Sequence, residues 1–164
     1  MPRIAKTREL FVTELQQLLY MEQELAEDVL PELRDEVTDP ALRLGIERHL
    51  DETREHVQRL EQAFQTLGEL PETERSRPLD ALVKEHKKLA SQIGPEYLRD
   101  LFDAGAAART EHLEIAGYRR LIALAPAVGA DDIVEQLERN LHEEQQALAE
   151  LDQVSDRLSR ELAV

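Results

Sequence analysis

The segment Arg109-Thr-Glu-His-Leu-Glu-Ile-Ala-Gly-Tyr118 combines an apolar helical pattern with two glutamates. It belongs to a longer series of apolar residues spaced three or four apart, which is typical of one face of an α-helix: Leu101, Ala104, Ala108, Ile115, Tyr118, Ile122 and Ala125. Glu111 occupies a position where that face requires an apolar residue, and Glu114 follows at its edge. A carboxylate in an apolar face is costly to desolvate unless something pairs with it. The stretch therefore predicts a buried helix that carries an acidic site.

The same anomaly recurs in other amphipathic segments. Glu22 interrupts an apolar face that starts at Phe11, and Glu144 interrupts another that starts at Val134. A third face has Thr53 at its centre, beside a stripe whose three members can converge on one point: His49, Glu52 and His56. We expect acidic and imidazole side chains from four helices to meet at one level.

Turn and cap residues divide the chain into helices with boundaries good to about three residues. Asp39-Pro40 is a helix start and Gly68 a helix end. Pro31 is expected to kink the first helix or end its regular hydrogen bonding, and residues 126–130 are expected to form a turn. The predicted helices are 7–37, 40–67, 79–91, 95–125 and 131–162.

Link lengths between these helices predict the topology. The first two and the last two long helices are joined by short links, which favour antiparallel hairpins. The middle link is about 27 residues long, enough to return the chain along the bundle. Glu47-Arg-His-Leu-Asp-Glu52 also resembles Glu138-Arg-Asn-Leu-His-Glu143, as a weak internal repeat of two hairpins would. The prediction is a single all-α domain over residues 1–164: a ferritin-like antiparallel four-helix bundle with a long crossover that carries a short extra helix.

Composition excludes several classes of function. The 164 residues carry a net charge of −15, which argues against nucleic-acid and membrane partners. Without cysteine there is no disulfide or thiolate metal site, and carboxylate and imidazole remain as strong ligands. No apolar signal core or transmembrane run is present, so a cytoplasmic location is expected.

Clustered glutamates without lysine or arginine on the central faces would repel one another, so they must either protonate or bind divalent cations. Oxygen ligands with a few imidazoles suit iron, manganese or, less selectively, zinc, and bridging carboxylates can hold two ions. The choice between Glu143 and Glu144, and between His49 and His56, stays open. The candidate metal ligands are Glu22, Glu52, His56, Glu111, Glu114 and Glu144.

Plainer interpretations exist for most of these residues. A glutamate at the edge of an apolar face is commonly solvated, which applies to Glu52, Glu114 and Glu143 taken singly. His49 and His56 can simply pair with nearby glutamates. Three further histidines, His86, His112 and His142, are expected at the surface, His112 alternatively behind a ligand. Tyr20 and Tyr118 are expected as core tyrosines whose hydroxyls find partners.

Four segments carry a resemblance to a known family: Arg8–Glu22, His49-Leu-Asp-Glu-Thr53 with Val57–Glu61, Glu111–Tyr118, and Leu141-His-Glu-Glu144. In these segments the chain resembles the YciE/YciF-like family of ferritin-like bacterial proteins. The resemblance implies a ferritin-like bundle, a homodimer, a di-metal carboxylate site and a stress-associated role. It matches the acidic pattern at Glu22, Glu52, Glu111, Glu114 and Glu144. The chain departs from typical di-iron bundles because neither Glu52 nor Glu144 is followed by histidine three residues later.

Two functions of different classes follow. The first is a protein that binds one or two iron or manganese ions in the bundle core, with oxidase or peroxide-detoxifying activity in a stress response. The alternative is a non-catalytic helical stress or scaffold protein that keeps the bundle without redox chemistry. Metal analysis of protein purified without chelator separates the two.

Overall fold

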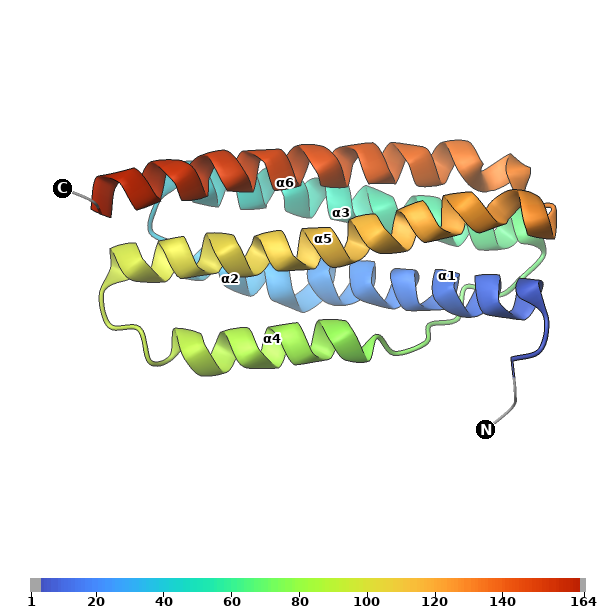
Figure 1. The fold of residues 1–164 in the computed structure, drawn as a ribbon, viewed down its shortest axis with the longest axis horizontal. Helices are drawn as coiled ribbons and strands as arrows, with labels where there is room; N and C mark the ends of the chain where they lie inside the picture. Colours follow the sequence, from blue (N-terminus) through green and yellow to red (C-terminus); the bar gives the residue numbers. More distant parts are fainter. Residues whose placement is uncertain (1–3, 163–164) are drawn as a thin grey trace.

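Long helices lie side by side in an antiparallel bundle (Figure 1). The structure is a computed structural model and describes residues 4–162, among which there is no β-strand. The first rod joins α1 (Thr7–Glu24), a π-helical segment η1 (Leu25–Val29) and α2 (Leu30–Glu36). The other long helices are α3 (Pro40–Leu67), α5 (Glu96–Val128) and α6 (Val134–Leu162), the last preceded by a 3₁₀ turn η2 (Asp131–Ile133). The short helix α4 (Arg77–Ala90) lies outside the bundle.

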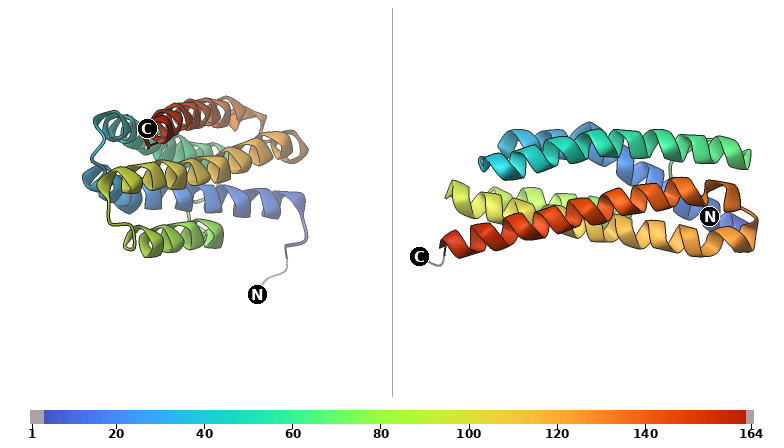
Figure 2. Two further views of the ribbon diagram at one scale, coloured as in Figure 1. Left: turned by 60° about the vertical axis from the view of Figure 1, so that its left-hand side comes forward. Right: turned by 90° about the horizontal axis from the view of Figure 1, so that it is seen from above.

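The connections confirm the predicted topology. Helix α1 packs against α3 and α5, and α6 packs against the same two helices from the other side. The chain leaves α3 at one end of the bundle and returns through α4 to the far end, where α5 begins (Figures 1 and 2). The fold is therefore the expected all-α, ferritin-like bundle with one long crossover. Among residues 4–162 no helix combines the length and apolarity needed to span a bilayer.

Local chemistry accounts for both ends of α3 and for the end of α5. The Asp39 carboxylate accepts a hydrogen bond of 2.9 Å from the Leu42 amide, and Pro40 opens α3. Gly68 and Gly129 end α3 and α5 in the left-handed conformation, at φ of 68° and 66°. Because this conformation strains residues that carry a Cβ, glycine is the natural terminator at both sites.

The two prolines inside helical segments differ in their effect. Helix α5 passes through Pro126 and ends at Val128, so residues 126–128 are helical rather than part of the predicted turn. Pro126 is exposed in the last turn, where one missing amide costs little. Before Pro31 the regular α-helical hydrogen bonding ends, which is one of the two expected outcomes, although the rod stays helical. A π turn takes its place, in which the Leu30 amide bonds to the Leu25 carbonyl, and it begins three residues after Glu22.

The apolar faces meet in one core that includes Phe11, Leu15, Leu18, Leu50, Leu60, Phe64, Tyr118, Leu121 and Leu137, all nearly inaccessible. Helix α4 buries Leu79 fully, but its Leu89 is 37% exposed, because α4 lies outside the bundle and buries only a narrow stripe. His86 on α4 is not a free surface residue. Its Nε2 lies 2.7 Å from a carboxylate oxygen of the buried Asp103, and its ring stacks on Phe102.

Asp100, whose role was not predicted from the sequence, connects the start of α5 to the link between α2 and α3. Its carboxylate, 3% exposed, accepts hydrogen bonds from the amides of Thr38 and Asp39, both of 2.8 Å, and from the Thr38 hydroxyl. One buried side chain thus holds the end of one hairpin against the other.

Replacing this side chain should destabilise the whole bundle. We expect Asp100→Ala to lower the free energy of unfolding by roughly 1–3 kcal/mol, because amides that lose a charged acceptor are left without a partner. Urea denaturation followed by circular dichroism measures the loss. The exposed Asp51→Ala variant is the control and should stay within about 0.5 kcal/mol of wild type; equal effects in the two variants would refute the role given to Asp100.

Candidate metal centre

Six buried side chains from all four long rods meet near the middle of the bundle. Their exposed fractions are 6% or less. Helix α1 supplies one of them, α3 two, α5 two and α6 one: Glu22, His49, His56, Glu111, Glu114 and Glu144. The helical periodicity that placed glutamates on apolar faces thus predicted where four of the carboxylates lie.

One group of three is formed by Glu22, His56 and Glu144, whose ligand atoms all lie within 4.8 Å of one another. Nδ1 of His56 is 3.3 Å from Glu22 Oε2 and 2.8 Å from Glu144 Oε1. These contacts are close enough for ion pairing, yet none of the three atoms is aligned for a hydrogen bond. One imidazole and two carboxylates therefore point at a common space.

A second group is formed by His49, Glu111 and Glu144, again within 4.8 Å. Nε2 of His49 is 3.3 Å from Glu111 Oε1 and 3.5 Å from Glu144 Oε2. Glu144 presents one oxygen to each group, so the two groups share it. Both histidines come from α3, two helical turns apart, and each serves a different group.

Glu114 is fully buried, and within residues 4–162 neither of its carboxylate oxygens forms a hydrogen bond. Both oxygens of Glu144 and one each of Glu22 and Glu111 are likewise buried without a hydrogen bond. A buried polar atom without a hydrogen bond costs free energy, and several such oxygens lie at one level of the bundle. Their clustering favours a positively charged partner at this level.

The outward nitrogens of the two histidines are held by other glutamates. Glu143 lies 2.9 Å from Nε2 of His56, and Glu52 lies 3.5 Å from Nδ1 of His49. Glu52 is in neither group, and its side chain is 30% exposed. Carboxylates in such positions orient an imidazole so that its other nitrogen faces the ligand.

A buried hydrogen-bond chain supports the first group from behind. The Tyr118 hydroxyl donates to Glu22 Oε1 and accepts from Nδ2 of Asn140 at 2.9 Å. Arg59 donates to Oδ1 of Asn140 at 2.7 Å and also to Glu143. The chain fixes the Glu22 carboxylate so that Oε2 faces His56. Tyr118 is the core tyrosine with a satisfied hydroxyl that the sequence predicts.

Burial and mutual repulsion favour the protonated forms of the acids. Burial, together with the Glu111 carboxylate, raises the pKa of Glu144 to about 7. Burial and the neighbouring carboxylates raise the pKa of Glu114 well above its ordinary value of 4.5, and burial and Glu144 raise that of Glu22. Burial alone would lower the pKa of His56, but Glu22 and Glu144 outweigh it and raise this pKa to about 10. The site therefore attracts positive charge, whether protons or cations.

The donor set fits a hard or borderline divalent cation, because it combines carboxylate oxygens with two imidazoles and contains no sulfur. The fold and these groups allow a metal site. The sequence left the choice between His49 and His56 open and named Glu52 as a candidate ligand. In the structure His49 belongs to the second group and Glu52 does not. The sequence signal for His49 is its spacing of seven residues from His56, which puts both rings on one face of α3. His112 and His142 are exposed, as expected.

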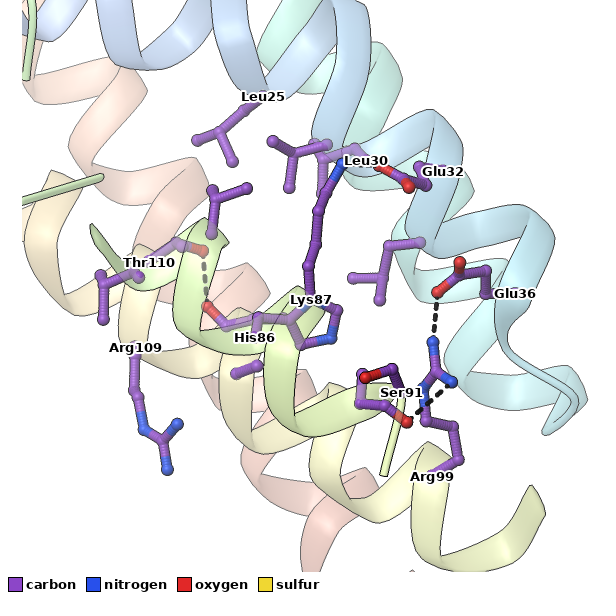
Figure 3. Close-up of a pocket in the computed structure, with 17 residues that line it drawn as sticks. Leu25, Leu30, Glu32, Glu36, His86, Lys87, Ser91, Arg99, Arg109 and Thr110 are labelled. Atoms are coloured by element: carbon purple, nitrogen blue, oxygen red, sulfur yellow. Dashed lines mark hydrogen bonds and ion pairs between the residues drawn. The ribbon is translucent and has the colours of Figure 1, made fainter. Parts of the chain in front are cut away.

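Two cavities flank the bundle near this level. The first, of about 290 Å³, lies between α4, α5 and the first rod, where Lys87 reaches Glu32 and Arg99 reaches Glu36 (Figure 3). The second, of about 530 Å³, opens between α3 and α6 and includes His49, Glu52 and Glu111 in its wall.

Comparisons with known proteins give the family. The chain is 35% identical to YcfI of Rhodopseudomonas palustris, proposed to be a structural protein, with a TM-score of 0.88 over 91% of this chain and 94% of that one. The Escherichia coli stress protein YciF has the same fold at 22% identity, with a TM-score of 0.89 over 96% and 99%. A protein of Xanthomonas campestris is 21% identical, with a TM-score of 0.75 over 96% of each chain.

A comparison with curated proteins gave no significant match. Residues 6–163 match a family described as Domain of unknown function (DUF892). This match and the structural relatives confirm the YciE/YciF-like resemblance seen in the sequence. The chain belongs to the DUF892 family.

Proposed function

We propose that this protein binds two iron or manganese ions in the bundle core and uses them to reduce dioxygen or a peroxide. Glu22 and His56 would hold one ion and His49 and Glu111 the other, with Glu144 as the residue that belongs to both groups. Glu114 completes the site. Bound there, the ions supply the electrons for the reduction.

The single observation that carries the proposal is the buried acidity of the site, where four carboxylates face two imidazoles. Within residues 4–162, no oxygen of Glu114 or Glu144 forms a hydrogen bond, although Glu144 lies at ion-pair distance from both histidines. A purely structural bundle would gain stability by placing apolar residues there, because buried charges rarely repay their desolvation. Retaining such groups is understandable if a cation pairs with them.

Neighbouring side chains hold the proposed ligands in position. Glu143 and Glu52 orient the two imidazoles, and Tyr118 donates to Glu22, so the three ligands are arranged before an ion arrives. We place the protein in the cytoplasm as a homodimer without nucleic-acid or membrane partners. A stress role is proposed by analogy with YciF, which is named as a stress protein.

Metal stoichiometry tests the shared-ligand arrangement. Protein purified without chelator and loaded with ferrous iron or manganese should hold about two ions per chain. Glu22→Gln and Glu111→Gln should each lose one ion, whereas Glu144→Gln should lose both, because amide oxygens bind such ions more weakly than carboxylates. Inductively coupled plasma analysis after gel filtration gives the counts.

The exposed Glu138→Gln on α6 is the control and should bind like wild type. A wild-type chain that stays metal-free after loading and remains fully folded would favour the scaffold alternative. Equal metal content in all variants would contradict the assignment of Glu22, Glu111 and Glu144 as metal ligands.

Stability should depend on pH in opposite ways with and without metal. The folded metal-free site keeps protons that the unfolded chain releases, since the pKa values of Glu144 and His56 are about 7 and 10 instead of 4.5 and 6.5. Folding stability without metal is therefore highest at low pH in this window and falls as pH rises. From pH 5 to pH 8 we expect a loss of at least about 1 kcal/mol, given about 1.4 kcal/mol per pKa unit.

Urea denaturation in the presence of chelator measures this slope. Metal-loaded protein should show the reverse slope, because ligands must lose their protons to bind. Glu144→Gln should flatten the metal-free curve. A metal-free wild type that becomes more stable between pH 5 and pH 8 would contradict the proton-holding site.

A further inference from the structure

The cavity between α3 and α6 connects the protein surface with the candidate centre. Its volume is about 530 Å³, within the range of roughly 300–1,000 Å³ that small organic ligands occupy. A water molecule takes about 30 Å³ of liquid, so this space greatly exceeds the needs of dioxygen or hydrogen peroxide. The size of the cavity points to an organic occupant.

Its inner wall contains ligand candidates of the second group. Glu111 is 1% exposed, and its Oε2 has no hydrogen-bond partner. His49 and Glu52 line the same cavity. An occupant therefore lies against the His49–Glu111 side of the centre rather than the more enclosed Glu22–His56 side, which is absent from the cavity wall.

The rest of the wall is mainly aliphatic, from Leu30, Leu42, Leu44, Ile46, Leu151 and Val154 together with several alanines. Arg48 on α3 pairs with Glu150 on α6, both about half exposed at the outer end, and Glu52 pairs with His49. The wall carries three carboxylates, Glu52, Glu111 and Glu150, against two basic groups, Arg48 and His49, so it disfavours an organic anion. An uncharged molecule with an apolar body fits best.

Gly45 is an unusual residue in the wall of this cavity. It lies in the interior of α3, where glycine costs about 1 kcal/mol relative to alanine. A Cβ placed on it would meet no atom within 4 Å, so no close helix contact requires glycine here. Gly45 is part of the cavity wall, and a larger side chain at this position would fill the cavity.

We propose that this cavity binds an organic hydroperoxide whose apolar body lies along α3 and α6 and whose peroxide group faces Glu111 and His49. The assignment rests on the proposed metal function. Reduction of the hydroperoxide breaks its O–O bond and gives an alcohol and water. Two protons are consumed, and the two electrons come from two ferrous ions, which become ferric.

Binding is tested first on the metal-free chain, with cumyl alcohol, the unreactive product of cumene hydroperoxide. Isothermal titration should show binding to wild type and to Gly45→Ala, and loss of binding in Gly45→Leu. Gly105→Leu is the matched control: Gly105 is also inside a long helix with open space around its Cβ, but it does not line this cavity. It should bind cumyl alcohol like wild type.

Turnover is tested on protein loaded anaerobically with ferrous iron. Gly45→Leu should slow iron oxidation by cumene hydroperoxide at least about tenfold, equivalent to 1.4 kcal/mol, while oxidation by hydrogen peroxide stays close to wild type. Gly105→Leu should change neither rate.

Absence of cumyl alcohol binding, or binding that is equal in wild type and Gly45→Leu, overturns the proposal whatever the metal content. The same holds if Gly45→Leu slows both oxidants equally, or changes only the oligomeric state in gel filtration. If the chain binds cumyl alcohol in a Gly45-dependent way but holds no iron, the metal function fails and the hydroperoxide assignment with it, and the cavity remains an organic-ligand site.

Discussion

Four glutamates lie inside an apolar bundle, and within residues 4–162 their basic partners are two histidines. Ionised carboxylates in a low-dielectric interior repel one another and attract any available positive charge. Protons can meet this demand, which explains why the pKa values of Glu114 and Glu144 lie above the ordinary value. Divalent cations meet it better, since one ion can pair with several carboxylates at once.

The fold brings these groups together and buries their side chains. Each long rod contributes ligand candidates to one level, and the crossover through α4 lets the two hairpins face each other in antiparallel fashion (Figure 2). Asp100 fixes one hairpin to the other, and the chain from Arg59 through Asn140 and Tyr118 fixes Glu22. Rigidity of this kind keeps the acidic site arranged even though its members repel.

Periodicity predicted the bundle and the level of the acidic site, because a glutamate on an apolar face is visible in the sequence at Glu22, Glu111 and Glu144. It could not assign the imidazoles, since His49 and Glu52 are neighbours on α3 and only packing decides which of them points inward. Asp100 and Asp103 were missed for a related reason. Their stripe continues through Ala107, Thr110 and Glu114, next to the predicted face, and shows that α5 is buried over a wider arc than its apolar residues suggest.

The two prolines show the same limit. Their effect on a helix depends on whether the neighbouring backbone can adjust, as the π turn before Pro31 does, and on whether the missing amide had a buried partner. Neither the adjustment of the backbone nor the burial of the lost hydrogen-bond partner can be predicted from the residues next to a proline.

Anomalous X-ray diffraction from crystals loaded with iron or manganese is the decisive test of a metal site in the bundle core. We expect two peaks there, one between Glu22 and His56 and one between His49 and Glu111, with Glu144 in contact with both. Loaded crystals that show no peak at this level, with the glutamates protonated and hydrogen-bonded to one another or to water, would contradict it.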